Sequence, residues 1–509
     1  MKRTLRRLAP SSTSSSAPPG RKRLVTRYAP SPTGGLHLGG LRTALYNVLL
    51  AHSAPSEFIL RIEDTDQSRL VPGSTEAIVD GLATCGLFSG KRNATHTQSK
   101  RLDVYAAHAE QLIDAKRAYR CFCSKERIDQ LRTSAKRQKI PYAYDGKCRH
   151  LTKDEVDEKM KRGEPHTVRL LVDAVDDDKI GVSDALRGKV HFSKDDIDDQ
   201  VLVKSDGFPT YHLASVVDDH LMGITHVVRG EEWLPSTPKH ALLYATFDWE
   251  MPTFVHLPLL LNSDGSKLSK RQGHVSVDAY LDDGYLPSAL VNFVALLGWS
   301  PKNDKEIFFS VDEIASEFSL DRLNVSNAQV DRVKLGWINA RHIRHALENE
   351  PEGEASRRIV NELRRRAADD DRHVDEQLLA DDAHVLRVLL LMSEKVKRTV
   401  EFWSLCDHFF FDALDLSDPD AVRAEKKLSK DAAAEVIKST IAALEQADAC
   451  VDRVLADQVD RCGGKIAAFM PLRWALTGRG AGAPLGPTIS ALGIERSVFR
   501  LKEAAKHLG

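Results

Sequence analysis

The sequence predicts an α/β fold: a Rossmann-type domain with a parallel nucleotide-binding sheet, an insertion within that sheet, and an all-helical C-terminal region. Residues 24–30 predict a buried strand, residues 37–52 a helix after a glycine-rich turn, and residues 57–64 a second strand. A strand, a helix and a strand in this order are typical of a parallel sheet. Residues 119–206 break into short segments with cysteines and acidic runs, which indicates an insertion. From residue 311 onward, apolar residues recur at spacings of three and four, which indicates helices.

The other elements are expected from the same patterns. Residues 99–118 predict a helix. The pattern of the sheet returns at residues 226–233, a helix follows at 237–247, and the apolar run 254–261 predicts another strand. In the C-terminal region, one amphipathic helix is predicted from Ile437, Ile441, Leu444, Ala447, Val451 and Leu455.

The segment from Arg27 to Gly40 carries residues that suit a nucleotide and an acidic substrate. Because the carboxyl ends of parallel strands meet at one edge of a sheet, we expect Arg27, Ser31 and Glu63 to lie near a ligand there. His37 begins a helix, whose N-terminus favours anions, and the nearby glycines let a nucleotide approach the backbone closely. A glycine pair alone would more often be an ordinary turn.

A second motif, Lys267-Leu-Ser-Lys-Arg271, follows an apolar strand far downstream. A cationic loop of this kind suits the neutralisation of charge that builds on a triphosphate. A lysine cluster alone would usually be a solvated surface. Together, the two motifs in this order predict ATP-dependent adenylation.

Bulk composition limits the class of protein. The chain has 509 residues, enough for several domains, with 42% hydrophobic and 28% charged residues, which is ordinary for a soluble protein. No apolar run is long enough to cross a bilayer, so no membrane partner is expected. The formal net charge of -1 does not by itself indicate a nucleic-acid binder, although basic side chains can gather on one face. Seven cysteines in so long a chain fit a reducing compartment.

The N-terminal segment has a composition of its own. The first 56 residues contain no Asp or Glu, and residues 1–22 are rich in Arg, Ser and Pro. A basic, acid-free N-terminus is typical of an organelle import presequence, and it has no apolar core of the secretory kind. We expect import into the mitochondrial matrix, while a plastid destination and a plain disordered basic tail are the alternatives.

A cysteine cluster in the insertion matches zinc chemistry. Cys121 and Cys123 form a Cys-x-Cys pair, and Cys148 and His150 form a Cys-x-His pair across a loop. Three thiolates and an imidazole complete a tetrahedral structural Zn²⁺ site. The alternative is that the cysteines are unmetallated core or surface residues.

Several motifs together resemble bacterial-type (organellar) glutamyl-tRNA synthetases, which are class I aminoacyl-tRNA synthetases. The resemblance rests on residues 27–45, Arg-Ile-Glu-Asp-Thr-Asp at 61–66, Val-Val-Arg-Gly-Glu-Glu at 227–232, residues 267–271, 331–339 and 469–478. It covers about residues 23–509, everything but the leader. The domains that it implies are a leader at 1–22, a class I Rossmann-type catalytic domain at 23–118 and 207–310, an acceptor-stem-binding insertion at 119–206, a stem-contact helical region at 311–370, and a helical anticodon-binding region at 371–509.

The resemblance also implies roles for individual residues. Glutamate-binding residues are expected to be Arg27, Tyr28, Ala29, Ser31, Glu63, Tyr211, His212, Ser215 and Arg229. ATP-binding residues are expected to be His37, Gly39, Gly40, Glu232, Lys267, Leu268, Ser269, Lys270 and Arg271, with His37 and Lys270 as the catalytic residues.

Elementary chemistry supports these roles. The planar fork of arginine suits the carboxylates of glutamate, and Glu63 suits its ammonium. The alternative for any single arginine is a surface ion pair. In glutaminyl relatives the position of Arg229 carries an uncharged residue, so an arginine there favours glutamate. Two positions depart from common patterns: Gly40 stands where many class I enzymes have a second histidine, and Ser215 where some relatives carry Asn.

The implied reaction has two steps. The α-carboxylate of L-glutamate attacks the α-phosphate of ATP, with Mg²⁺ and Lys270 absorbing charge, and the terminal ribose of tRNA(Glu) then attacks the mixed anhydride. We expect tRNA(Gln) to be charged as well, with a strictly discriminating enzyme as the alternative, and we expect a monomer. A shorter relative that glutamylates a tRNA base lacks the C-terminal region. A catalytically inactive RNA-binding paralogue would be expected to have lost Lys270, His37 or the arginines.

Overall fold

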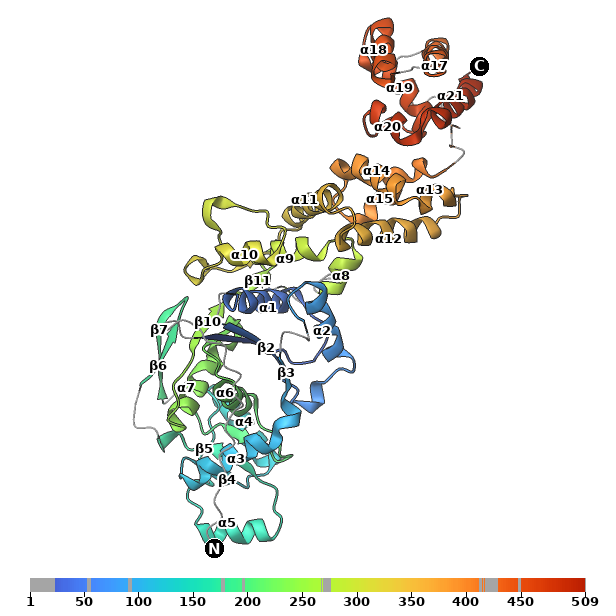
Figure 1. The fold of residues 1–509 in the computed structure, drawn as a ribbon. Helices are drawn as coiled ribbons and strands as arrows, with labels where there is room; N and C mark the ends of the chain where they lie inside the picture. The colour runs from blue at the N-terminus through green and yellow to red at the C-terminus, as the bar shows by residue number, and fades with distance from the viewer. Residues whose placement is uncertain are drawn as a thin grey trace. The chain divides into compact units, whose positions relative to one another are not determined.

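The computed structural model divides the chain into two compact units (Figure 1). The first contains the described residues up to Leu268 together with Val294–Val330, and the second contains the remaining described residues. The residues that the structure describes are 23–52, 56–89, 94–174, 179–194, 197–266, 268, 276–411, 414, 416, 429–446 and 450–508.

A seven-stranded sheet organises the first unit. From one edge to the other its strands are β3 (Ala94–Thr97), β2 (Ser56–Ile62), β1 (Leu24–Tyr28), β9 (His226–Gly230), β10 (Thr253–Leu257), β6 (Lys179–Asp184) and β7 (Gly188–Ser193). Neighbouring strands are parallel except for β6 and β7, which form an antiparallel hairpin. The predicted parallel nucleotide-binding sheet is therefore confirmed, with an antiparallel edge that makes the whole sheet mixed.

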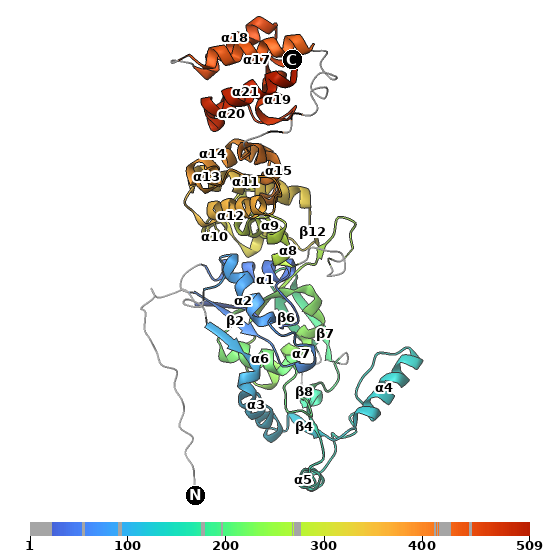
Figure 2. The same ribbon diagram turned by 90° about the vertical axis from the view of Figure 1, so that its right-hand side faces the viewer.

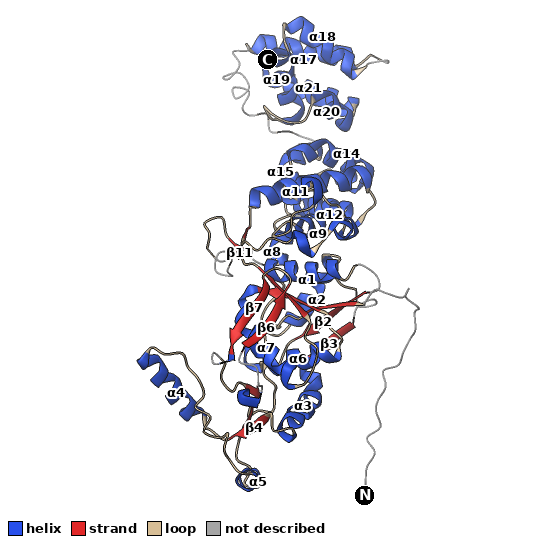
Figure 3. Ribbon diagram, turned by 90° about the vertical axis from the view of Figure 1, so that its left-hand side faces the viewer, coloured by secondary structure: helices blue, strands red, loops and turns tan. Residues whose placement is uncertain are grey.

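Helices cover both faces of this sheet, as in doubly wound α/β folds. Figures 1 and 3 show α1 (Leu38–Leu50) and α2 (Ser74–Thr84) on one side, and α6 (Tyr211–Leu221) and α7 (Thr237–Thr246) on the other. α3 (Leu102–Asp114) belongs to the same core as α6 and α7. That core is closed by apolar side chains from these helices and from β10, including Leu213, Val216, Val217, Leu242, Leu243 and Phe254.

The segment 119–206 contributes two separate structures. One is a three-stranded antiparallel sheet of β4 (Ala118–Cys121), β5 (Thr167–Leu170) and β8 (Val201–Val203), with α4 (Lys125–Gln138) and α5 (Lys153–Lys161) between its first two strands. α5 lies beyond β4, on the side away from the seven-stranded sheet (Figures 1 and 2). The other is the β6–β7 hairpin, which extends the main sheet by pairing β6 with β10. The sequence analysis assigned these residues to the insertion and did not predict that they join the main sheet.

The described residues after the main sheet are mostly helical, as the sequence predicted. Two very short strands, β11 (Leu260–Leu261) and β12 (Ala328–Gln329), pair with each other in the first unit. Beyond Asp331, all described elements are α-helices or short 3-10 helices. The helices after the sheet are α8 (Val277–Asp282), α9 (Pro287–Ala295), α10 (Val311–Glu317), α11 (Arg332–Asn349), α12 (Glu354–Ala368), α13 (Glu376–Ala380), α14 (Asp382–Met392), α15 (Phe402–Cys406), α17 (Lys430–Leu444), α18 (Val451–Cys462), α19 (Lys465–Thr477), α20 (Leu485–Leu492) and α21 (Ile494–Leu508).

One predicted element is wrong. The pattern from Ile437 to Leu455 predicted a single helix, but α17 ends at Leu444 and α18 begins at Val451. The spacing of three and four continues across the break, so periodicity alone cannot detect it. Ala447, which the pattern included, lies outside the described residues.

Among the described helices, none is long and apolar enough to cross a membrane.

Candidate active site

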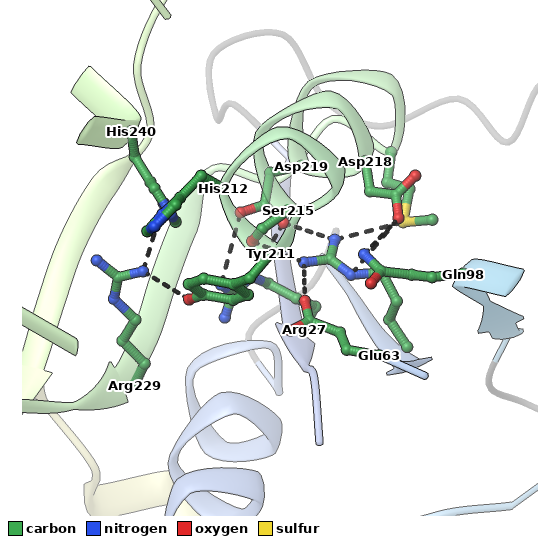
Figure 4. A network of polar contacts seen from close by, with 12 residues as sticks. Arg27, Glu63, Gln98, Tyr211, His212, Ser215, Asp218, Asp219, Arg229 and His240 are labelled. Atoms are coloured by element: carbon green, nitrogen blue, oxygen red, sulfur yellow. Dashed lines mark hydrogen bonds and ion pairs between the residues drawn. The ribbon is translucent and has the colours of Figure 1, made fainter. Parts of the chain in front are cut away.

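A buried network of charges lies where β1 and β2 end, against α6 (Figure 4). Arg27 Nε and Nη2 donate to the two carboxylate oxygens of Asp219 at 3.1 and 3.5 Å. Arg61 Nη1 donates to Asp219 Oδ1 at 2.6 Å, and its Nη2 donates to Glu63 Oε1 at 3.0 Å and to Ser215 Oγ at 3.3 Å. Two guanidinium groups are therefore paired with carboxylates of the chain itself.

The two carboxyl groups of this network differ in pKa. Burial alone would raise the pKa of Asp219, but the charges of Arg27 and Arg61 hold it below its usual value. Burial raises the pKa of Glu63 above its usual value, against the opposing charges of Arg61 and Arg27. The two guanidinium groups thus favour the charged form of Asp219, and a cation arriving beside Glu63 would likewise favour its ionised form.

A second acid on the same helix, Asp218, links α6 to the segment 98–105. Asp218 Oδ2 accepts from Gln98 Nε2 at 3.0 Å and from the Tyr105 hydroxyl at 2.8 Å, and Oδ1 accepts from Arg101 Nε at 2.9 Å. Sequence reasoning missed Arg61, Asp218 and Asp219. The available signal was the adjacent pair of acids at the end of the otherwise apolar run Leu213–Val217, since ionised side chains are buried only when they are paired.

Arg229, at the end of β9, is held in a different way (Figure 4). It is 5% exposed, and no ion pair among the described residues involves it. Its N–H groups face neutral acceptors: His256 Nε2 at 3.0 Å, the Tyr211 hydroxyl at 3.0 Å, Thr237 Oγ1 at 2.9 Å, Trp233 O at 3.3 Å and His240 Nδ1 at 3.5 Å.

The histidines around Arg229 are neutral. Burial, followed by nearby cations, lowers the pKa of His212 to about 3 and also lowers the pKa of His240. Burial likewise lowers the pKa of His256, against the hydrogen bond to Asp184, which raises it. Because Arg229 can only donate, His240 accepts through Nδ1, and its Nε2 proton then points to His212 Nδ1 at 3.1 Å. The guanidinium of Arg229 is therefore hydrogen-bonded by neutral groups, and no carboxylate among the described residues neutralises its charge. This state suits a carboxylate ligand.

The start of α1 forms the second part of the site. His37 is the N-cap, and its Nδ1 accepts from the backbone N–H of Gly40 at 2.9 Å. A Cβ atom on Gly40 would lie 2.5 Å from the Tyr28 hydroxyl and 3.2 Å from Leu36 Cδ1, so no other residue fits there without a shift. Burial raises the pKa of Tyr28, which keeps its hydroxyl neutral.

The remaining predicted site residues that the structure describes are exposed or half-buried. Ser31 and Glu232 are exposed and Ala29 is half-buried, while the backbone N–H of Leu268 donates to Leu260 O at 3.1 Å. Glu232 lies against Gly230, where an added Cβ would meet its carboxylate at 2.2 Å. Lys267, Ser269, Lys270 and Arg271 lie outside the described residues.

Three of the four predicted zinc ligands come together. The Sγ atoms of Cys121, Cys123 and Cys148 lie within 4.8 Å of one another. His150 is exposed and does not belong to this group. The Tyr144 hydroxyl takes its place: it lies 3.3 Å from the Sγ atoms of both Cys121 and Cys123 and accepts from the Cys148 backbone N–H at 3.2 Å.

The spacing of these atoms fits a tetrahedral metal. With Zn–S bonds of about 2.3 Å, tetrahedral geometry places sulfur atoms about 3.8 Å apart, and Cys123 and Cys148 are 3.7 Å apart. The hydrogen bond between Cys121 and Cys148 lowers the pKa of Cys121 and raises that of Cys148, so this pair favours one thiolate beside one thiol. Arg127 Nη1, 3.4 Å from Cys123 Sγ, adds a nearby cation.

Comparisons with known proteins identify the family of the chain. Residues 23–337 match the family model of class I tRNA synthetases (E and Q), catalytic domain, and residues 359–505 match an anticodon-binding domain. The fold and the site therefore define a class I aminoacyl-tRNA synthetase. Since similarity to glutamate–tRNA ligases extends over nearly the whole chain, as the relatives below show, the chain belongs to the glutamate–tRNA ligase family.

The relatives are bacterial. The chain is 40% identical to the glutamate–tRNA ligase of Chloroherpeton thalassium over 95% of its length and 98% of that protein. It is also 40% identical to that of Prosthecochloris aestuarii, over 96% and 98%. A crystal structure of a glutamate–tRNA ligase from Elizabethkingia meningosepticum in complex with its amino acid superposes with a TM-score of 0.82 at 32% identity, covering 96% of this chain and 100% of that one.

The contact between Gly40 and Tyr28 gives a testable prediction. We expect Gly40→Ala to lower the free energy of unfolding by about 1–3 kcal/mol, because the added methyl overpacks the start of α1, and to raise the KM for ATP. Thermal unfolding and ATP–pyrophosphate exchange measure the two effects. Adding Tyr28→Phe removes the clashing hydroxyl, so the double variant should recover most of the loss. A double variant as impaired as Gly40→Ala would contradict the steric explanation.

Proposed function

We propose that this enzyme activates L-glutamate with ATP and transfers it to the 3′ end of tRNA(Glu). The observation that carries the proposal is Arg229, a buried cation that is held by neutral acceptors. A site for glutamate needs one cation free to pair with the side-chain carboxylate. Arg229 meets that need, whereas Arg27 and Arg61 are already paired with acids.

Each residue of the site binds a different group of the substrate. Arg229 binds the side-chain carboxylate by replacing its two longest contacts, to His240 at 3.5 Å and Trp233 O at 3.3 Å. The Tyr211 hydroxyl, which accepts from Arg229, has its own proton to donate to the same carboxylate. The ionised form of Glu63 receives the ammonium group, and the remaining N–H groups of Arg27 face the substrate backbone.

The nucleotide belongs at the start of α1. The exposed His37 and the close approach at Gly40 form a surface for ATP, and the N-terminus of α1 favours its phosphates. Mg²⁺ supplies charge neutralisation on the triphosphate when it is bound. The sequence motif with Lys267 and Lys270 supplies the cations for the phosphates in this proposal. Positioning and electrostatics then carry the reaction, since no protein nucleophile is required.

The glutamate assignment predicts a selective loss of function. Arg229→Ala should lower kcat/KM for glutamate about 30- to several thousand-fold, because losing a buried charge-assisted pair costs about 2–5 kcal/mol. ATP–pyrophosphate exchange with and without tRNA measures the effect, and filter binding should show unchanged tRNA affinity. Arg117→Ala, which removes a half-exposed ion pair with Asp248, is the matched control. An unchanged KM and turnover for glutamate in Arg229→Ala would overturn the assignment.

We also propose that the enzyme works in mitochondrial translation, as a monomer, and charges tRNA(Gln) as well as tRNA(Glu). The basic, acid-free segment 1–22 supports import, and the similarity to bacterial enzymes supports an organellar tRNA pool.

Three measurements test the organellar proposal. A fluorescent fusion of residues 1–40 should accumulate in mitochondria, and removal of residues 1–22 should leave aminoacylation intact, because β1 begins at Leu24. Purified organellar tRNA(Gln) should accept glutamate. A fusion that stays in the cytosol defeats import, and an uncharged tRNA(Gln) defeats dual charging. Neither outcome affects the activity on tRNA(Glu).

We further propose a structural Zn²⁺ bound by Cys121, Cys123 and Cys148, with the Tyr144 oxygen as the fourth ligand. The spacing of the three sulfur atoms and the Tyr144 oxygen supports it. Burial and the hydrogen bonds with Cys121 and Cys123 raise the pKa of the Tyr144 hydroxyl, so Tyr144 would bind as a neutral phenol. A metal here would tie β4 to the loop before α5.

Elemental analysis tests this metal site. Purified protein should carry close to one equivalent of zinc, and Cys148→Ser should lose it and lower Tm. Tyr144→Phe should weaken zinc retention against a chelator, whereas His150→Ala should not. The reverse result would make His150 the fourth ligand, and full stability of zinc-free protein would remove the site altogether.

A further inference from the structure

Asp184 lies at the carboxyl end of β6 and makes an unusual set of contacts. Its Oδ1 accepts from the backbone N–H groups of Leu186 and Arg187, each at 2.9 Å. Its Oδ2 accepts from the backbone N–H of His256 at 3.2 Å and from His256 Nδ1 at 2.6 Å. All four partners are donors, so only a carboxylate, with two acceptor oxygens, satisfies them.

His256 relays this contact to the glutamate site. An Asp carboxylate cannot donate, so the proton of the hydrogen bond with Asp184 sits on His256 Nδ1. On the other side of the ring, Arg229 Nε donates to His256 Nε2 at 3.0 Å, so that nitrogen must carry a lone pair. The two neighbours together allow one form of the ring, the neutral Nδ1–H tautomer.

The contacts among Asp184, His256 and Arg229 are buried, so we expect a change in one of these residues to affect the other two. Asp184 is 3% exposed and His256 is fully buried, and the guanidinium of Arg229 also lies over the Phe254 ring, with Cζ 5.0 Å from the ring centroid. The imidazole separates the carboxylate of Asp184 from the guanidinium, so Arg229 receives an oriented acceptor without a direct ion pair. A carboxylate in the place of His256 would instead neutralise the charge that a substrate needs.

We propose that Asp184 is a positioning residue for glutamate recognition: it fixes the His256 tautomer, and His256 fixes the orientation of Arg229. This inference rests on the proposed role of Arg229 at the substrate carboxylate. It assigns a function to the β6–β7 hairpin, whose single register pair with β10 is Phe254 with Asp184.

A purely structural role is the alternative, because Asp184 also stabilises the turn between β6 and β7. Arg187 separates the two roles. It lies in the same turn and pairs with Glu231, whose Oε1 accepts from the backbone N–H of Leu259 at 3.2 Å. Among the described residues, its side chain makes no hydrogen bond or ion pair with His256. Arg187→Ala therefore loosens the hairpin while leaving the Asp184–His256 contact in place.

Kinetics of the full-length enzyme test the inference. Asp184→Asn places an amide N–H₂ against donors, so the glutamate KM should rise about 10- to 100-fold, the usual cost of losing such a supporting contact, with little change in the KM for ATP. His256→Leu should behave alike. His256→Gln, whose amide donates to Asp184 and accepts from Arg229, should stay close to the wild type, as should Arg187→Ala.

Nitrogen NMR of protein labelled at histidine supplies a readout that does not depend on activity. The signals that disappear in His256→Gln identify His256, which should show a protonated Nδ1 and an unprotonated Nε2. In Asp184→Asn the proton should move to Nε2. If Asp184→Asn does not fold, His256→Leu and the wild-type tautomer decide the question.

The outcomes separate this inference from the proposed function. An Nε2-protonated His256 in the wild type, an unchanged glutamate KM in Asp184→Asn or His256→Leu, or an equal loss for glutamate and ATP would overturn the positioning role. Arg229→Ala, measured in parallel, tests the site itself. If that variant loses glutamate use while Asp184→Asn keeps it, only the positioning role fails; if Arg229→Ala keeps it, the assignment of the glutamate site fails.

Discussion

The compensation of buried arginine charge is the constraint on which the site depends. Taking an unpaired guanidinium out of water costs on the order of several kcal/mol, so each buried arginine needs partners. Arg27 and Arg61, on neighbouring strands, share the carboxylate of Asp219. Arg229, on the strand at the other side of β1, is held only by neutral acceptors. The same edge of the sheet thus holds two arginines that are paired within the chain and one whose charge remains available.

Local patterns were sufficient to predict the frame of this site. The strand–helix–strand unit, the return of the sheet near residue 226 and the helical C-terminal region follow from periodicity and turn residues, and the structure confirms them. The placement of Arg27 and Glu63 at strand ends followed from the rule that ligands bind at the carboxyl edge of a parallel sheet. These predictions needed only the order of elements along the chain.

The partners of these residues could not be predicted in the same way, because they depend on contacts between distant segments. Asp219 meets Arg27 across 192 positions of sequence, and Asp184 meets His256 across 72. Neither acid belongs to a recognisable motif, and each would be an ordinary surface carboxylate by residue type alone. Likewise, sequence spacing favoured His150 as a zinc ligand, whereas the fold brings the Tyr144 hydroxyl to the three sulfur atoms.

The β6–β7 hairpin shows why the edge of the sheet matters for chemistry at its centre. It comes from the same stretch of sequence as the three-stranded sheet and the cysteine cluster, yet it pairs with β10 beside the site. Through Asp184 the hairpin reaches His256 on β10, and through His256 it reaches Arg229 on β9. A parallel sheet aligns its strand ends by backbone hydrogen bonds alone, but it does not set the rotation of a guanidinium. That rotation requires an acceptor of fixed direction, and an imidazole locked by a carboxylate supplies one.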